Sequence, residues 1–258
     1  MINFPPLRTK RFTVQLQEMT IGQGIAIAGM PPQFPQAEAT AFLRAVIKPG
    51  QNLGKLADPI DWTVQERLFT ICHYIAATAE DGPDFSVGEG HYSDYIDAGK
   101  DSEVPESIEL GTIADDEYVL HQLTGRMAEA IERLVGEVND TNGGPLPVRL
   151  HWIIGGMAAQ LQRVKYEGNP SENAVDSAAY DDWLLKRMRV FCEFPEADFW
   201  AVAVAYLDGR TKLSHLLSID FTNDGIVVLP NEGGAAADLP PARFPARSCV
   251  SALTLRMG

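Results

Sequence analysis

The sequence predicts a mainly helical α+β fold, in which a helical core carries a small β element and extended arms lie at both ends. Three observations lead to this prediction. Thr63 stands three residues before Glu66, the capping-box arrangement at a helix start. Apolar residues then recur every three or four positions as far as Ala79, which places them on one helical face. Residues 12–17 alternate apolar and polar side chains, which is typical of a half-buried strand.

The N-terminal residues 1–11 are expected to form an extended arm, because two consecutive prolines disfavour a helix there. Arg8, Lys10 and Arg11 make this arm the most basic patch of an acidic chain. A solvated tail is one interpretation. The alternative is a segment that docks on an acidic neighbouring subunit.

The middle of the chain is expected to be one mainly helical domain over residues 12–229, interrupted by an irregular acidic loop at 80–113. Helical spacing or capping residues predict helices at 20–28, 37–48, 63–79, 115–138, 147–164, 177–191 and 196–207. The last of these helices has almost no polar face.

The C-terminal part begins with the small β element that complements the N-terminal strand. Residues 216–221 and 225–229 are predicted to pair as a hairpin through the turn Thr222-Asn223-Asp224. Residues 230–258 are rich in glycine, alanine and proline, and we expect them to form a second extended arm.

Charge and composition exclude several classes of function. The formal net charge is −14 at pH 7, which repels phosphate backbones and argues against nucleic-acid binding. Cys72, Cys192 and Cys249 are widely spaced and odd in number, as expected for reduced thiols in a cytosolic setting. The sequence contains no apolar window long enough for a membrane span, so no membrane partner is expected.

No catalytic, cofactor or metal site is predicted. Cys72 and His73 are adjacent on a predicted helix, so their side chains point about 100° apart and cannot pair with each other. The acidic loop holds four possible ligands for a divalent cation, but their spacing matches neither a zinc site nor a calcium loop. They are Glu89, His91, Asp94 and Asp97. A core cysteine and a solvated acidic loop are the simpler interpretations.

Two stretches resemble proteins encoded among the tail and baseplate genes of tailed bacteriophages. They are residues 12–23, followed by a helix of small residues, and residues 63–69, followed by the loop 84–96. The nearest family is the group of baseplate hub and tail-assembly proteins, and the similarity covers roughly residues 3–100. The resembling residues include no catalytic residue.

This resemblance implies a structural protein of the tail or baseplate rather than an enzyme. It would reside in the virion, and in the host cytoplasm during assembly, as part of a symmetric ring or hub that contacts other tail proteins. A non-virion assembly chaperone and a cytosolic cysteine-dependent hydrolase are the alternatives. An adaptor inside the host cell is a third. Candidate interface residues lie in the arms and the acidic loop: Phe4, Arg8, Lys10, Arg11, Phe85, His91, Tyr92, Tyr95 and Phe244.

Overall fold

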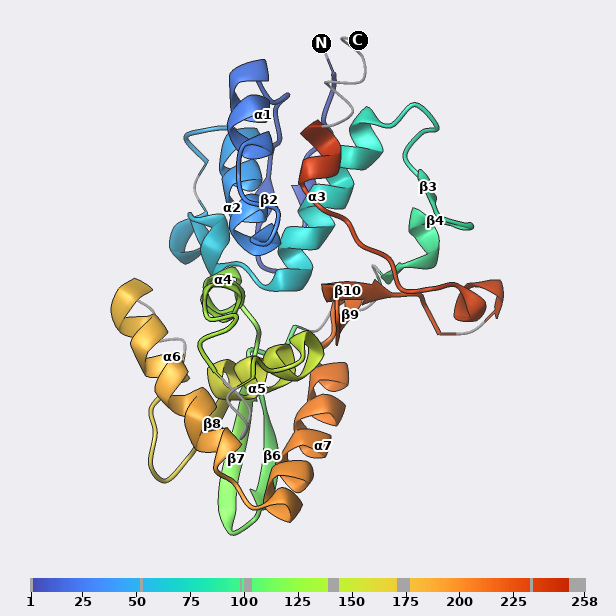
Figure 1. Cartoon of the computed structure of the whole chain (residues 1–258). Coiled ribbons are helices and arrows are strands. Elements are labelled where there is room, and N and C mark those ends of the chain that lie inside the picture. The colour runs from blue at the N-terminus through green and yellow to red at the C-terminus, as the bar shows by residue number, and fades with distance from the viewer. Residues whose placement is uncertain are drawn as a thin grey trace. The chain divides into compact units, whose positions relative to one another are not determined.

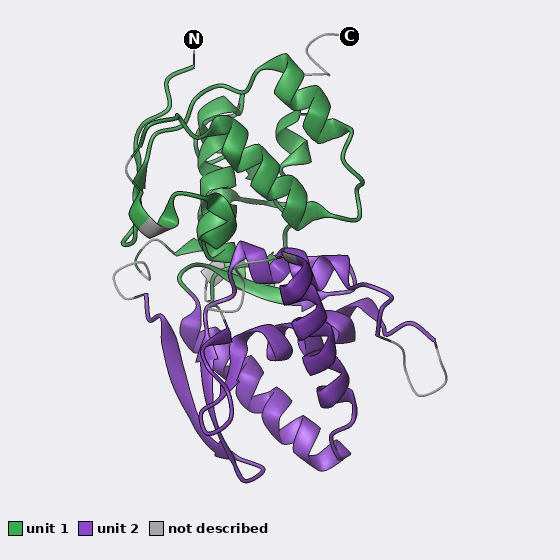
Figure 2. Ribbon diagram, turned by 90° about the vertical axis from the view of Figure 1, so that its left-hand side faces the viewer, with its two compact units in different colours: residues 1–103, 215–220, 227–258 green, residues 104–214, 221–226 purple. Residues whose placement is uncertain are grey.

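The structure is a computed structural model that describes residues 2–51, 53–97, 99, 104–138, 144–170, 177–232 and 234–250 (Figure 1). The predicted mainly helical α+β class is confirmed. The chain divides into two compact units, shown in Figure 2: unit 1 comprises residues 1–103, 215–220 and 227–258, and unit 2 comprises residues 104–214 and 221–226. The stretch 12–229, expected as one domain, therefore contributes to both units, and both expected arms belong to unit 1.

The framework of unit 1 consists of the helices α1 (Ile21–Ala28), α2 (Pro35–Val46) and α3 (Val64–Thr78), with 3-10 turns η1 (Gly54–Leu56) and η2 (Pro59–Asp61) between α2 and α3. Thr20 caps α1 and Thr63 caps α3, as the sequence predicts. In each case the third helical residue, Gln23 or Glu66, completes a capping box. Helix α2 packs against both α1 and α3.

The strands of unit 1 are short and antiparallel. They pair as β1 (Leu7–Arg8) with β2 (Thr13–Val14), β3 (Ser86–Val87) with β4 (Gly90–His91), and β5 (Ile96–Asp97) with β9 (Leu216–Thr222). The predicted C-terminal hairpin is confirmed, because β9 is also hydrogen-bonded to β10 (Gly225–Leu229). The remaining turns are η3 (Tyr92–Asp94) and η6 (Gly234–Asp238).

Both terminal segments pack onto unit 1. Phe4 is 5% exposed, and its ring stacks on Tyr74 with centroids 5.0 Å apart. Near the other end, Phe244 is buried, and the Arg247 guanidinium pairs with the buried Glu38 carboxylate at 2.9 Å. Residues 247–250 are helical; residues 251–258 lie outside the described part of the chain.

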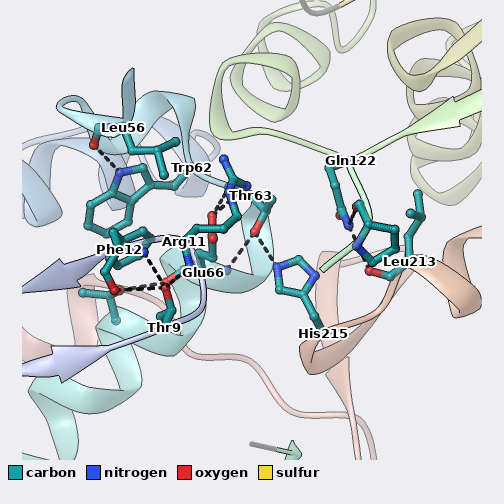
Figure 3. Close-up of polar contacts among 12 residues, drawn as sticks. Thr9, Arg11, Phe12, Leu56, Trp62, Thr63, Glu66, Gln122, Leu213 and His215 are labelled. Carbon is teal, nitrogen blue, oxygen red and sulfur yellow. Dashed lines mark hydrogen bonds and ion pairs between the residues drawn. The ribbon is translucent and has the colours of Figure 1, made fainter. Parts of the chain in front are cut away.

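A buried polar network surrounds the start of α3 (Figure 3). The Thr63 backbone N–H donates to Glu66 Oε2 at 2.9 Å, and this oxygen also pairs with Arg11 Nη1 at 3.2 Å. The Thr63 hydroxyl lies 3.0 Å from His215 Nε2. The network joins distant segments of unit 1, and its Thr63–His215 contact is buried, since both residues are 0% exposed.

Unit 2 is built on a three-stranded antiparallel sheet in the order β6-β7-β8, with β6 (Ser107–Ile113), β7 (Asp116–His121) and β8 (Leu161–Arg163). The prediction of a helix over 115–138 is wrong for its first part, because β7 occupies that stretch and α4 (Gly125–Arg133) begins after it. The acidic stretch 80–113, expected to be irregular throughout, ends in β6. The connection between β6 and β7 is the two-residue turn Ala114-Asp115, and both residues have positive φ.

Helix α5 (Val148–Gln160) lies at the centre of unit 2 and packs against α4, α6 (Ser177–Cys192) and α7 (Glu196–Leu213). Gly155 and Gly156 allow this close packing: a Cβ on Gly155 would lie 2.7 Å from Ile131 Cγ2. Helix α7 also packs against β6 and β7 and continues to Leu213, beyond the end predicted at residue 207.

Candidate functional site

The aromatic residues predicted to form an interface are buried inside unit 1. Phe85 stacks on Tyr92 with ring centroids 5.1 Å apart. Phe244 meets Phe85, Tyr92 and Tyr95 edge to face, and the Tyr95 hydroxyl donates to the Pro240 carbonyl at 2.8 Å. The structure thus brings four of the predicted residues together, but as the centre of a core, and Phe4 lies in a second core.

The predicted polar interface residues do lie at the surface. Arg8, Lys10, Arg11 and His91 are exposed. Arg11 forms the ion pair described above, and His91 Nδ1 lies 3.3 Å from the carbonyl oxygen of Asp84. Arg8, Lys10 and Arg11 belong to the N-terminal segment, whereas His91 belongs to β4.

The thiol chemistry required by a cysteine hydrolase finds no support in unit 1. Cys72 is 0% exposed, and burial, with a smaller effect of Cys249, raises the pKa of its thiol. Burial also raises the pKa of Cys249 to about 12. His73 does not face Cys72: its Nε2 lies 2.9 Å from the carbonyl oxygen of Pro5. Both thiols therefore stay protonated at neutral pH, which is the unreactive form.

A candidate site in the described residues is an open apolar groove of about 730 Å³ within unit 2. It lies where the first half of α5 meets the end of α6 and the start of α7, and the segment after α4 completes it. Its apolar lining consists chiefly of Leu150, Ile154, Phe191, Phe194, Phe199 and Trp200.

Aromatic side chains dominate this groove. Phe191 and Phe194 lie with ring centroids 5.2 Å apart, and Phe199 meets Trp200 edge to face at 5.6 Å. Trp200 is 56% exposed, and Val204, one turn further along α7, is 55% exposed. The apolar surface therefore continues out of the groove along α7.

Carboxylates surround the groove. Glu137, Glu193 and Glu196 line it together with a single cation, Arg189. In the part of the chain that the structure describes, none of these three carboxylates takes part in an ion pair. Cys192 also lines the groove and is exposed; partial burial, and then the nearby Glu193 charge, raise the pKa of its thiol.

Among the described residues, no group of three or more potential ligands is placed to hold a metal ion, and no helix is long and apolar enough to cross a membrane. Comparison with protein-family models, with curated proteins and with solved structures finds no match to this chain.

The interface prediction did not include the residues of this groove. One signal for it was present: a helix without a polar face at residues 196–207 must be either fully buried or covered by something else. The structure shows that α7 is buried on one side only, at Val202, Ala203 and Tyr206, while Trp200 and Val204 remain exposed.

Proposed function

We propose that this chain is a structural component of a bacteriophage tail or baseplate and that it works by docking to other tail proteins. The phage setting comes from the resemblance of residues 12–23, 63–69 and 84–96. The docking role is supported by one observation above all: the groove of unit 2 is a concave apolar surface lined by aromatic side chains, of which Trp200 is 56% exposed. Exposed Trp and Phe in such a surface are typical of protein-binding sites.

The chemistry of the chain supports a binding role over a hydrolytic one. A cysteine hydrolase needs a thiolate close to a base, whereas burial raises the pKa of Cys72 and Cys249. The Thr63 hydroxyl and His215 Nε2 lie 3.0 Å apart, and both residues are 0% exposed, so neither side chain is open to solvent.

Mass spectrometry of purified tail particles tests this proposal. The particles come from cells that produce the phage encoding this chain. A structural component stays in the particle at a fixed ratio to the other tail proteins. A chaperone, the second candidate, is found in assembly intermediates and is absent from finished tails. Absence from both refutes the proposal and its alternative.

A variant with Trp200 replaced by Asp tests whether incorporation into tail particles depends on the groove. Trp200 is 56% exposed, so the substitution should leave the folded chain intact. We expect this variant to be lost from particles, because a charge at the centre of an apolar contact is costly to bury. Tyr166→Asp, at a side chain in unit 2 that is 60% exposed and outside the groove, is the matched control. Normal incorporation of the Trp200 variant would exclude the groove as the docking site.

A further inference from the structure

We propose that the groove of unit 2 binds an amphipathic α-helix of a partner protein that carries Lys or Arg residues beside its apolar face. This inference rests on the proposed function, since it names the chemistry of the partner for the same groove.

The lining of the groove favours a helix as the occupant. Every lining residue belongs to a helix or to a segment that flanks one. No strand edge in the described part of the chain borders it, so an extended peptide would find no row of backbone groups there to pair with. A helix instead fits a groove between helices by packing its side-chain ridges into it, with anchors at three- and four-residue spacing.

The apolar lining of the groove indicates that the partner helix inserts an apolar face. Phe199 and Trp200 stand at the start of α7, and the exposed Val204 prolongs this surface by one turn. Phe191 and Phe194, which line the groove, also line a small neighbouring hollow together with the exposed Val190. A partner therefore needs several apolar anchors along one helical stripe.

The charge of the groove indicates which residues should flank the apolar stripe of the partner helix. Three carboxylates and one guanidinium line the groove, and these carboxylates form no ion pairs within the described residues. The whole chain carries a net charge of −14, which attracts a basic partner and repels an acidic one. A basic helix is thus both steered to the groove and neutralised in it, whereas a second copy of this acidic chain is disfavoured.

Selection from a displayed library of random peptides of about 16 residues, roughly four helical turns, tests the inference on the purified full chain. We expect the enriched peptides to carry apolar residues at three- and four-residue spacing together with a net positive charge. Enriched peptides that are acidic, or that lack the helical spacing, would overturn the inference. An empty selection would overturn it too.

Variants then locate the binding site of one enriched peptide by fluorescence anisotropy. Trp200→Ala should weaken binding roughly ten-fold or more, while Tyr166→Ala leaves it unchanged. The unfolding transition of both variants is measured to show that they are folded. Equal affinity for Trp200→Ala and the unaltered chain would overturn the assignment.

Charge reversal isolates the electrostatic part of the inference. The double variant Glu137→Lys/Glu193→Lys should bind the peptide about ten-fold more weakly and with a smaller dependence on salt. The double variant Glu109→Lys/Glu117→Lys is its matched control, because it changes the net charge equally at exposed positions on β6 and β7. If both double variants weaken peptide binding equally, the preference for a basic peptide comes from the net charge of the whole chain. That result would contradict the role of the groove carboxylates.

Two further outcomes separate this inference from the proposed function. Sedimentation that shows self-association through the groove would identify a second copy as the occupant and overturn the basic-helix partner. The mass spectrometry of tail particles is independent of the peptide data. A chain that is stoichiometric in particles but selects no basic helix retains the proposed function and loses this inference.

Discussion

Replacement of Gly156 by Ala is predicted to destabilise unit 2 strongly, because α5 has no room for a side chain at this position. An added Cβ would overlap the Tyr206 hydroxyl oxygen and lie 3.1 Å from Phe221 Cε2. Tyr206 is 0% exposed and donates to Gln160 Oε1 at 2.7 Å, so its ring cannot move aside without losing this buried hydrogen bond. Overpacking and the lost hydrogen bond each cost about 1–3 kcal/mol, and we expect about 3 kcal/mol together.

Urea unfolding followed by circular dichroism measures this effect, and the melting temperature should fall by about 10 °C. Gly22→Ala is the control. Gly22 also lies inside a helix, but nothing stands within 4 Å of an added Cβ there. This control should gain up to about 1 kcal/mol from the better helix propensity of Ala. A Gly156→Ala variant within about 0.5 kcal/mol of the unaltered chain would contradict the described packing of α5 against α7.

Three further predictions concern thiols, the N-terminal segment and pH. In the native chain, Ellman's reagent should modify the exposed Cys192 well before the buried Cys72 and Cys249, which react only after unfolding; reaction of all three thiols at similar rates would contradict the described burial. Phe4→Ala should lower the free energy of unfolding by about 3 kcal/mol, because this ring is 5% exposed and stacked in a core; a variant as stable as the unaltered chain would show that the N-terminal segment does not belong to the core. Burial lowers the pKa of His151, so the unfolded chain binds a proton more readily and stability should fall as the pH drops through about 6.5. In His151→Gln this contribution should vanish from the pH profile of urea unfolding, and an unchanged profile would exclude His151 as its source.

Local signals predicted the helices of unit 1 well. Thr20 and Thr63 each stand directly before an apolar periodic stretch, and both form the capping boxes that their spacing indicates. In unit 2, the predicted helix at 177–191 corresponds closely to α6 (Ser177–Cys192). In these cases the capping or the periodic pattern lies inside the element itself, so distant parts of the chain are not needed to recognise it.

The β6–β7 hairpin was missed because its turn lacks the usual residues. Ala114 and Asp115 have φ values of 48° and 66°, which Gly or Asn adopts at much lower cost. The strand β7 also carries Leu120, whose spacing to Leu123 and Met127 continues the apolar period of α4 and extends the predicted helix too far. Pairing with β6 and β8 decides the conformation here, and it depends on residues far apart in the sequence.

The candidate groove depends on tertiary packing in the same way. The sequence shows that residues 196–207 have almost no polar face, but only the packing of α7 reveals which of these residues stay exposed. The predicted interface aromatics illustrate the converse. Tyr92 and Phe244 are far apart in the sequence, and their side chains meet only in the folded core.

The accessibility of Cys192 tests the docking role of the groove most directly, because this thiol lines the groove and is exposed in the free chain. Its rate of reaction with a maleimide is measured in the isolated protein and in the tail particles or assembly intermediates that contain it. If a partner docks in the groove, the Cys192 thiol of the assembled form should react at least about ten-fold more slowly than that of the free chain. The same thiol should regain its original rate after dissociation. Equal rates in the free and assembled forms would show that the groove stays open and would contradict the proposed docking.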